Sequence, residues 1–122
     1  MSTLTVTNIK ATGETASRAV SGVAAAWVNF NGTGTPAARD SFNHSSITDN
    51  GTGHYTNTVS SALANANYGV TAMSQDTSVG DCVAFDSATA PTTTAVRIYN
   101  FTTGSSVADC ARICLSYHGD LA

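Results

Sequence analysis

Three histidines, His44, His54 and His118, are the residues of this chain best suited to hold a metal ion. A zinc site needs three or four ligands that converge within about 2.0–2.3 Å of the ion. The histidines and cysteines of this sequence do not group at the spacing of such a ligand set. In a symmetric trimer one residue on the axis could supply three ligands, and the sequence leaves that alternative open. From a single chain we expect neither a metal nor a cofactor.

The glycine-rich run Gly32-Thr33-Gly34-Thr35 and the scattered aspartates are the remaining candidates for chemistry. A phosphate-binding loop would continue with Gly-Lys-Ser/Thr and open a helix, whereas Pro36 follows here, so we expect a turn. A two-carboxylate hydrolase would need a pair such as Asp81 and Asp86. The acids lack the spacing of a calcium loop, and no Gly-x-Ser-x-Gly nucleophile elbow occurs. We expect a protein without enzymatic activity and without catalytic residues.

The three cysteines, Cys82, Cys110 and Cys114, favour a structural interpretation. Their odd number, with no recognisable signal peptide, indicates reduced thiols. Cys110 and Cys114 are expected on one face of the last strand, too far apart for an easy local disulfide. We expect buried thiols, while a bridge from Cys82 to one of the others stays open if the protein meets an oxidising environment.

The elements that position these residues are predicted to be strands. Charged residues make up 11% of the chain, and the polar share comes from Ser, Thr, Asn and Gly, which suits strands and tight turns better than long surface helices. Runs of alternating or β-branched residues bounded by turn residues predict strands over Leu4–Ile9, 23–31, Ser41–Thr48, His54–Val59, Tyr68–Met73, Cys82–Phe85, Ala95–Phe101 and Ala108–Tyr117.

A hairpin at Asp49-Asn50-Gly51-Thr52-Gly53 is the strongest local signal. Asn-Gly suits the positive φ angles of a two-residue turn, and Gly53 can occupy a second such position as a bulge. The regular spacing of strands and turns predicts an all-β fold, an antiparallel β-sandwich of about eight strands with an extended N-terminal arm. We assign residues 1–22 to an N-terminal strand or arm with its linker, and residues 23–122 to the sandwich.

Charge and hydropathy exclude several classes of partner. The net charge is −3 with five Lys and Arg in total, and these cations are too scattered to bind phosphates, so no nucleic-acid partner is expected. No apolar run approaches the roughly 20 residues of a membrane-spanning helix. We therefore expect no membrane insertion, synthesis in the cytoplasm of the cell that makes the protein, and no secretion by a signal peptide.

Several blocks of the chain resemble a domain that recurs in bacteriophage tail-fibre and related virion-surface proteins. The blocks that carry the resemblance are Ala26-Trp27-Val28-Asn29-Phe30-Asn31-Gly32, Arg39-Asp40-Ser41-Phe42-Asn43, Ser46-Ile47-Thr48-Asp49-Asn50-Gly51-Thr52-Gly53-His54-Tyr55 and Ala66-Asn67-Tyr68. The resemblance implies a homotrimer on the virion surface and transfers no functional residue. It favours a structural or adhesive role.

Two functions fit that resemblance. The first is a capsid decoration (cement) protein, or a similar accessory subunit, that binds a major capsid or tail protein as trimers. Its candidate assembly arm adds a strand to a neighbour and consists of Thr3, Leu4, Thr5, Val6, Thr7, Asn8 and Ile9. The alternative is a short tail fibre or fibre-tip module that recognises host surface glycans through the loops over residues 49–53, 75–81 and 86–94. Its candidate contacts are Asp49, Asn50, His54, Asp76 and Asp81.

Overall fold

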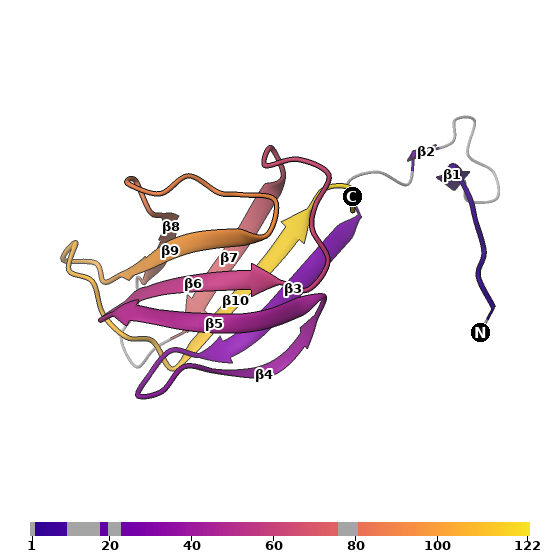
Figure 1. The fold of residues 1–122 in the computed structure, drawn as a ribbon. Helices are drawn as coiled ribbons and strands as arrows, with labels where there is room; N and C mark the ends of the chain where they lie inside the picture. Colours follow the sequence, from indigo (N-terminus) through magenta and orange to yellow (C-terminus); the bar gives the residue numbers. More distant parts are fainter. Residues whose placement is uncertain (1, 10–17, 20–22, 76–80) are drawn as a thin grey trace.

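The computed structural model describes residues 2–9, 18–19, 23–75 and 81–122, and within these ranges the chain is all-β (Figure 1). The main strands are β3 (Ala24–Asn31), β4 (Ala37–Phe42), β5 (His44–Gly51), β6 (His54–Val59), β7 (Gly69–Gln75), β8 (Cys82–Phe85), β9 (Ala95–Phe101) and β10 (Arg112–His118). They form two four-stranded antiparallel sheets, β4-β3-β10-β7 and β5-β6-β9-β8. The predicted antiparallel β-sandwich of about eight strands is confirmed.

The N-terminal segment carries less regular structure than its alternating sequence predicts. β1 (Asn8–Ile9) pairs with β2 (Arg18–Ala19) as a two-residue antiparallel ladder. The strand predicted over Leu4–Ile9 therefore forms only at its last two residues, and the segment assigned as linker contributes β2. Residues 2–9 lie away from both sheets in Figure 1.

The core lies between the two sheets and is built by alternation. Along β6 the alternate residues Tyr55, Asn57 and Val59 are all buried. Residues of alternating position are also buried along β3, β9 and β10. This period of two is what one covered sheet face requires. The fully buried side chains include Phe30, Val28, Tyr55, Ile98, Val96, Ile113, Leu115 and Tyr117.

The prediction of one strand over Ser41–Thr48 is wrong. These residues belong to two strands, which lie in different sheets. β4 ends at Phe42 and β5 begins at His44, with Asn43 between them at a φ of 51°. Asn tolerates this left-handed conformation better than most residues. Its side chain fixes the corner by donating to the carbonyl oxygens of Ala25 (3.0 Å) and Ser61 (3.1 Å).

The predicted hairpin between β5 and β6 is confirmed. Gly51 and Gly53 have φ angles of 128° and 63°, and the register shifts between Asp49 and Gly51 as in a bulge. Gly53 also lies against the β9–β10 connection, where a Cβ atom would stand 2.6 Å from the backbone nitrogen of Ala108. Glycine is therefore required there both by φ and by space.

The strand predicted over Ala108–Tyr117 begins late, at Arg112, and this changes the prediction for the cysteines. Cys110 lies in the connection before β10 and is buried, with its thiol 3.1 Å from the carbonyl oxygen of Gln75. Cys114 lies on β10 and is partly exposed, so the two cysteines do not share a strand face. All three cysteines lie in the described part of the chain, and none forms a disulfide.

Candidate functional site

The outer face of the sheet β4-β3-β10-β7 gathers large apolar side chains that the core does not use. Phe42, Trp27 and Met73 are 54%, 36% and 74% exposed. The strand register sets two rows across this face, which are Phe42–Trp27–Ser116–Thr71 and Asp40–Asn29–Cys114–Met73. Within these two rows Asp40 is the one charged residue.

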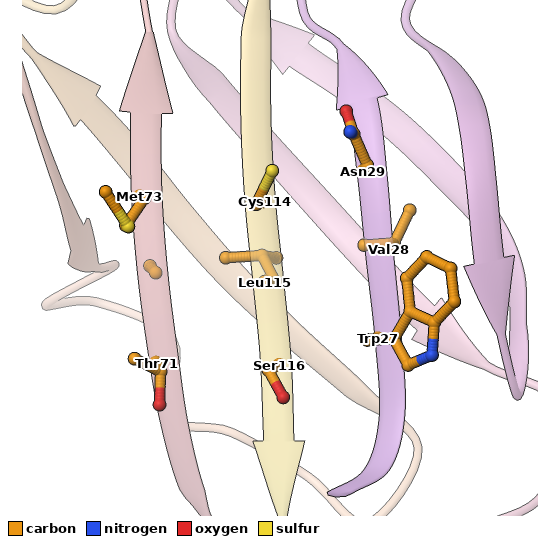
Figure 2. A pocket seen from close by; sticks show the side chains of 9 residues that line it. Trp27, Val28, Asn29, Thr71, Met73, Cys114, Leu115 and Ser116 are labelled. Atoms are coloured by element: carbon orange, nitrogen blue, oxygen red, sulfur yellow. The ribbon is translucent and has the colours of Figure 1, made fainter.

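A shallow groove of about 450 Å³ crosses this face. Figure 2 shows Trp27 on β3 and Met73 on β7, with Cys114 and Ser116 on β10 between them. Asn29 and Thr71 add polar groups to the lining. We call this surface, with its two rows, the Trp27–Met73 face.

The side chains of the Trp27–Met73 face are suited to binding a partner. Large uncovered aromatic and methionine side chains with little charge are typical of the centre of a protein interface. An indole ring with amide and hydroxyl groups beside it could also receive a sugar ring. Within the described ranges no acid, base and nucleophile are grouped here.

The candidate loop contacts Asp49 and Asn50 are exposed but are engaged within their own hairpin. The Asp49 carboxylate accepts the backbone N–H of Gly51 at 2.9 Å. The Asn50 amide donates to the hydroxyl of Thr56 at 2.8 Å. These side chains stabilise the turn and leave fewer groups for a ligand.

The candidate His54 is not a loop contact, because its ring lies over the outer face of the second sheet. It stacks on Tyr99 with ring centroids 4.0 Å apart. Its Nε2 lies 3.1 Å from a carboxylate oxygen of Asp86, and the Nε of Arg97 lies 3.3 Å from the same oxygen. Only 12% of the His54 side chain and 2% of the Asp86 side chain are exposed.

Asp86 is the centre of this cluster, and its pKa is lowered from the ordinary value. The main cause is the backbone N–H of Ala88, which donates to the carboxylate at 2.8 Å, and burial opposes the shift. The hydrogen bond with His54 and the charge of Arg97 lower the pKa further. The arrangement stabilises the charge of a buried carboxylate, which is a structural role.

The candidate loops do not form one surface. Asp81 precedes Cys82, which pairs with Phe101 near the hairpin end of the sheet. The connection over residues 86–94 rejoins the sheet at Ala95, which pairs with Thr58 at the other end of β6. Asp76 lies outside the described residues. Asp81 is partly buried and accepts a long contact of 3.5 Å from the Asn100 amide.

The candidate assembly arm is exposed where its side chains are described, over residues 2–8. Leu4 and Val6, two apolar residues at alternate positions, are 85% and 43% exposed. Among the described residues no three His, Cys, Asp or Glu side chains come together as metal ligands. The same ranges contain no helix of the length and hydropathy that crossing a membrane demands.

Sequence reasoning missed the Trp27–Met73 face and the acid Asp109. The large residues on both faces of β3 indicated that its outer face is apolar. The place of Met73 on the same face follows only from the register of β3, β10 and β7. Asp109 accepts both the backbone N–H of Gly53 (2.7 Å) and the hydroxyl of Tyr55 (3.0 Å). Nothing in the local sequence indicates these long-range partners.

Comparisons of this chain with protein-family models, with curated proteins and with solved structures found no significant match.

Proposed function

We propose that this chain is a non-enzymatic structural protein of a bacteriophage virion, a decoration or similar accessory subunit that binds the particle surface as a homotrimer. The observation that carries the proposal is the Trp27–Met73 face, which presents three large apolar side chains and one charge across a sheet. The blocks between Ala26 and Tyr68 that resemble virion-surface proteins supply the biological setting. Its partners are further copies of itself and a major capsid or tail protein.

The low charge of the chain supports a role as a surface layer. A subunit that is covered by a particle on one side does not need a charged coat on that side. In a symmetric array, contacts that are individually weak add up because many sites bind together. The Trp27–Met73 face provides such a contact on a rigid sheet, which holds its side chains in fixed register.

The alternative function, a tail-fibre module that recognises host surface glycans, is favoured by one feature. The Trp27 ring has the amide of Asn29 and the hydroxyls of Ser116 and Thr71 nearby in the groove. A flat apolar ring can pack on the apolar face of a sugar, and the polar groups around it can bind the sugar's hydroxyl groups. This alternative moves the binding site from the loops to the sheet face, because Asp49, Asn50 and His54 are already engaged.

The deciding experiment measures the copy number and location of the chain on purified particles, by quantitative protein staining and labelled-antibody imaging. Hundreds of copies over the head support the decoration protein. A few copies at the tail support the glycan-binding module, and the isolated protein should then adhere to host cells. Absence from particles contradicts both functions. An unrelated particle from the same host serves as the control for adventitious adsorption.

A further inference from the structure

The sandwich is open along the side where β7 and β8 end the two sheets. A groove of about 320 Å³ lies there, lined by Val70, Ala72, Val83, Ala84, Phe85 and Ile98. Phe85 pairs in register with Ile98, which is 1% exposed and belongs to the core, yet Phe85 itself is 50% exposed. Ala72 pairs with the buried Leu115 and is also incompletely covered. Among the described residues, no layer covers these inward positions.

The backbone at this opening is also unpaired. Among the described strands β7 pairs only with β10, and β8 pairs only with β9. Each strand therefore presents one edge whose N–H and C=O groups make no ladder. A further strand laid along either edge would satisfy backbone groups and direct every second side chain into the groove.

The chain itself contains a strand-like segment of which only Asn8 and Ile9 lie in a ladder, the two-residue pairing of β1 with β2. Residues 2–9 are uncharged and rich in Thr, Val and Ile, which favour strands. Leu4 and Val6 are two residues apart, so in an extended chain they lie on one face about 7 Å apart. Both are exposed, at 85% and 43%.

We propose that residues 2–7 of a second copy add a strand at the β7–β8 opening and place Leu4 and Val6 in the groove against Phe85. This inference rests on the proposed homo-oligomeric role and names the contact that builds the oligomer. A second copy is the occupant because residues 2–9 lie away from their own sandwich (Figure 1), while their apolar side chains and the groove both stay uncovered. Head-to-tail exchange of arms is a heterologous contact, which forms a closed ring such as a trimer where the rotation from one subunit to the next closes.

This contact leaves the Trp27–Met73 face available. That face lies on the outside of the sheet β4-β3-β10-β7, whereas the groove opens between the two sheets, and Ala72 on β7 is the one lining residue that the two share. Self-association and attachment to a particle would then use separate surfaces of one subunit. The arm would build the oligomer, and the sheet face would dock it.

The first test compares two charge substitutions on the same exposed segment by analytical ultracentrifugation of the full chain. The variant L4D/V6D places charges in the groove, and T5D/T7D places the same charges on the opposite face of the strand. We expect the wild type and T5D/T7D to associate alike, and L4D/V6D to associate about 100-fold more weakly or worse, since two apolar side chains lose their burial. Equal association of all three proteins, or a monomeric wild type, would overturn the proposal.

The second test traps the contact with a disulfide. A tagged L4C protein is mixed with an untagged F85C protein, both carrying C82S to remove the exposed native thiol on β8. A mixed disulfide-linked dimer is expected, and it should be much weaker when T5C replaces L4C. If the double variant L4C/F85C instead forms a disulfide within one chain, the arm covers its own groove and the proposal is wrong.

The two proposals fail separately. If the chain is found on particles but L4D/V6D associates like the wild type, the arm contact is wrong and the virion role stands. If the chain is absent from particles but the mixed disulfide forms, the arm contact stands and the virion role is wrong.

Discussion

The hydroxyl group of Tyr55 donates a hydrogen bond to the backbone carbonyl oxygen of Gly32 at 2.9 Å. This bond joins β6 of one sheet to the turn after β3 of the other. The hydroxyl has one proton, which it shares between this carbonyl and a carboxylate oxygen of Asp109 that lies 3.0 Å away. Burial, followed by the hydrogen bond to Asp109, raises the pKa of Tyr55, so the hydroxyl stays protonated as the donor this contact needs. The two sheets are thus joined by a polar contact inside the core.

Gly32→Ala should destabilise the protein through this contact. A Cβ atom at Gly32 would stand 2.6 Å from the Tyr55 hydroxyl and 3.0 Å from the carbonyl oxygen of Cys110, so the sheets must shift. We expect a loss of about 1–3 kcal/mol in the free energy of unfolding, measured by urea denaturation. Gly104→Ala is the control, because the nearest atom to its Cβ is 3.9 Å away. Equal effects of the two substitutions would contradict the steric explanation.

Asp86→Asn should lower stability at neutral pH and lose that effect in acid. The folded-state pKa of Asp86 is lowered below its ordinary value of 3.8 by Ala88, His54 and Arg97. The carboxylate therefore stabilises the fold above about pH 3.8, and this contribution disappears as the pH falls through the folded-state pKa. Denaturation of wild type and variant at pH 7 and at pH 2.5 measures the change, with the exposed Asp120→Asn as control. A difference independent of pH would contradict the charged role.

His44→Gln should flatten the dependence of stability on pH below neutrality. Burial lowers the pKa of His44 below its ordinary value of 6.5, and hydrogen bonding with Asn57 and Ser46 opposes the shift. As the pH falls below 6.5 the unfolded chain binds a proton before the folded chain does, so the wild type loses stability down to the folded-state pKa. Thermal unfolding between pH 7 and 5 should show a smaller decline in the variant. An equal decline in the two proteins would contradict this explanation.

Met73→Glu should weaken attachment to particles without unfolding the protein. The side chain is 74% exposed, so its replacement should change the free energy of unfolding by about 0.5 kcal/mol or less. A charge at position 73, where the Trp27–Met73 face reaches β7, would have to be desolvated on docking. Thr48→Glu, which is exposed on the other sheet, is the matched control. Equal binding of both variants to particles that lack the native protein would exclude this face as the attachment surface.

Local signals were sufficient for the strands and turns that depend on neighbouring residues. The bounds predicted for Cys82–Phe85 and Ala95–Phe101 match β8 and β9, and the Asn50-Gly51 turn lies where it was expected. In each case the period of two and the turn residues act within a few positions along the chain. Nothing distant is needed to place them.

Features that depend on distant partners could not be predicted. The corner at Asn43 exists because Ala25 and Ser61 bind its side chain, and an Asn within an alternating run gives no sign of this. His54 was expected to be a loop contact. Its link to Asp86 could not be foreseen, because the two residues lie far apart in the chain. The Trp27–Met73 face likewise follows from the register of β3, β10 and β7, which the separate strands do not encode.

The position of β10 between β3 and β7 sets the order in which this protein can be completed. β3 and β7 are both synthesised before β10, which consists of residues 112–118. Both strands pair with β10, so neither ladder can form until β10 is present. Most of one sheet therefore cannot form before β10 has been synthesised, since its central ladder joins segments almost a whole domain apart. Until then the inward faces of β3 and β7 are uncovered and prone to wrong association. Subunits of this kind reach their final shape only after synthesis of β10, so assembly with other copies must begin after translation has passed that point.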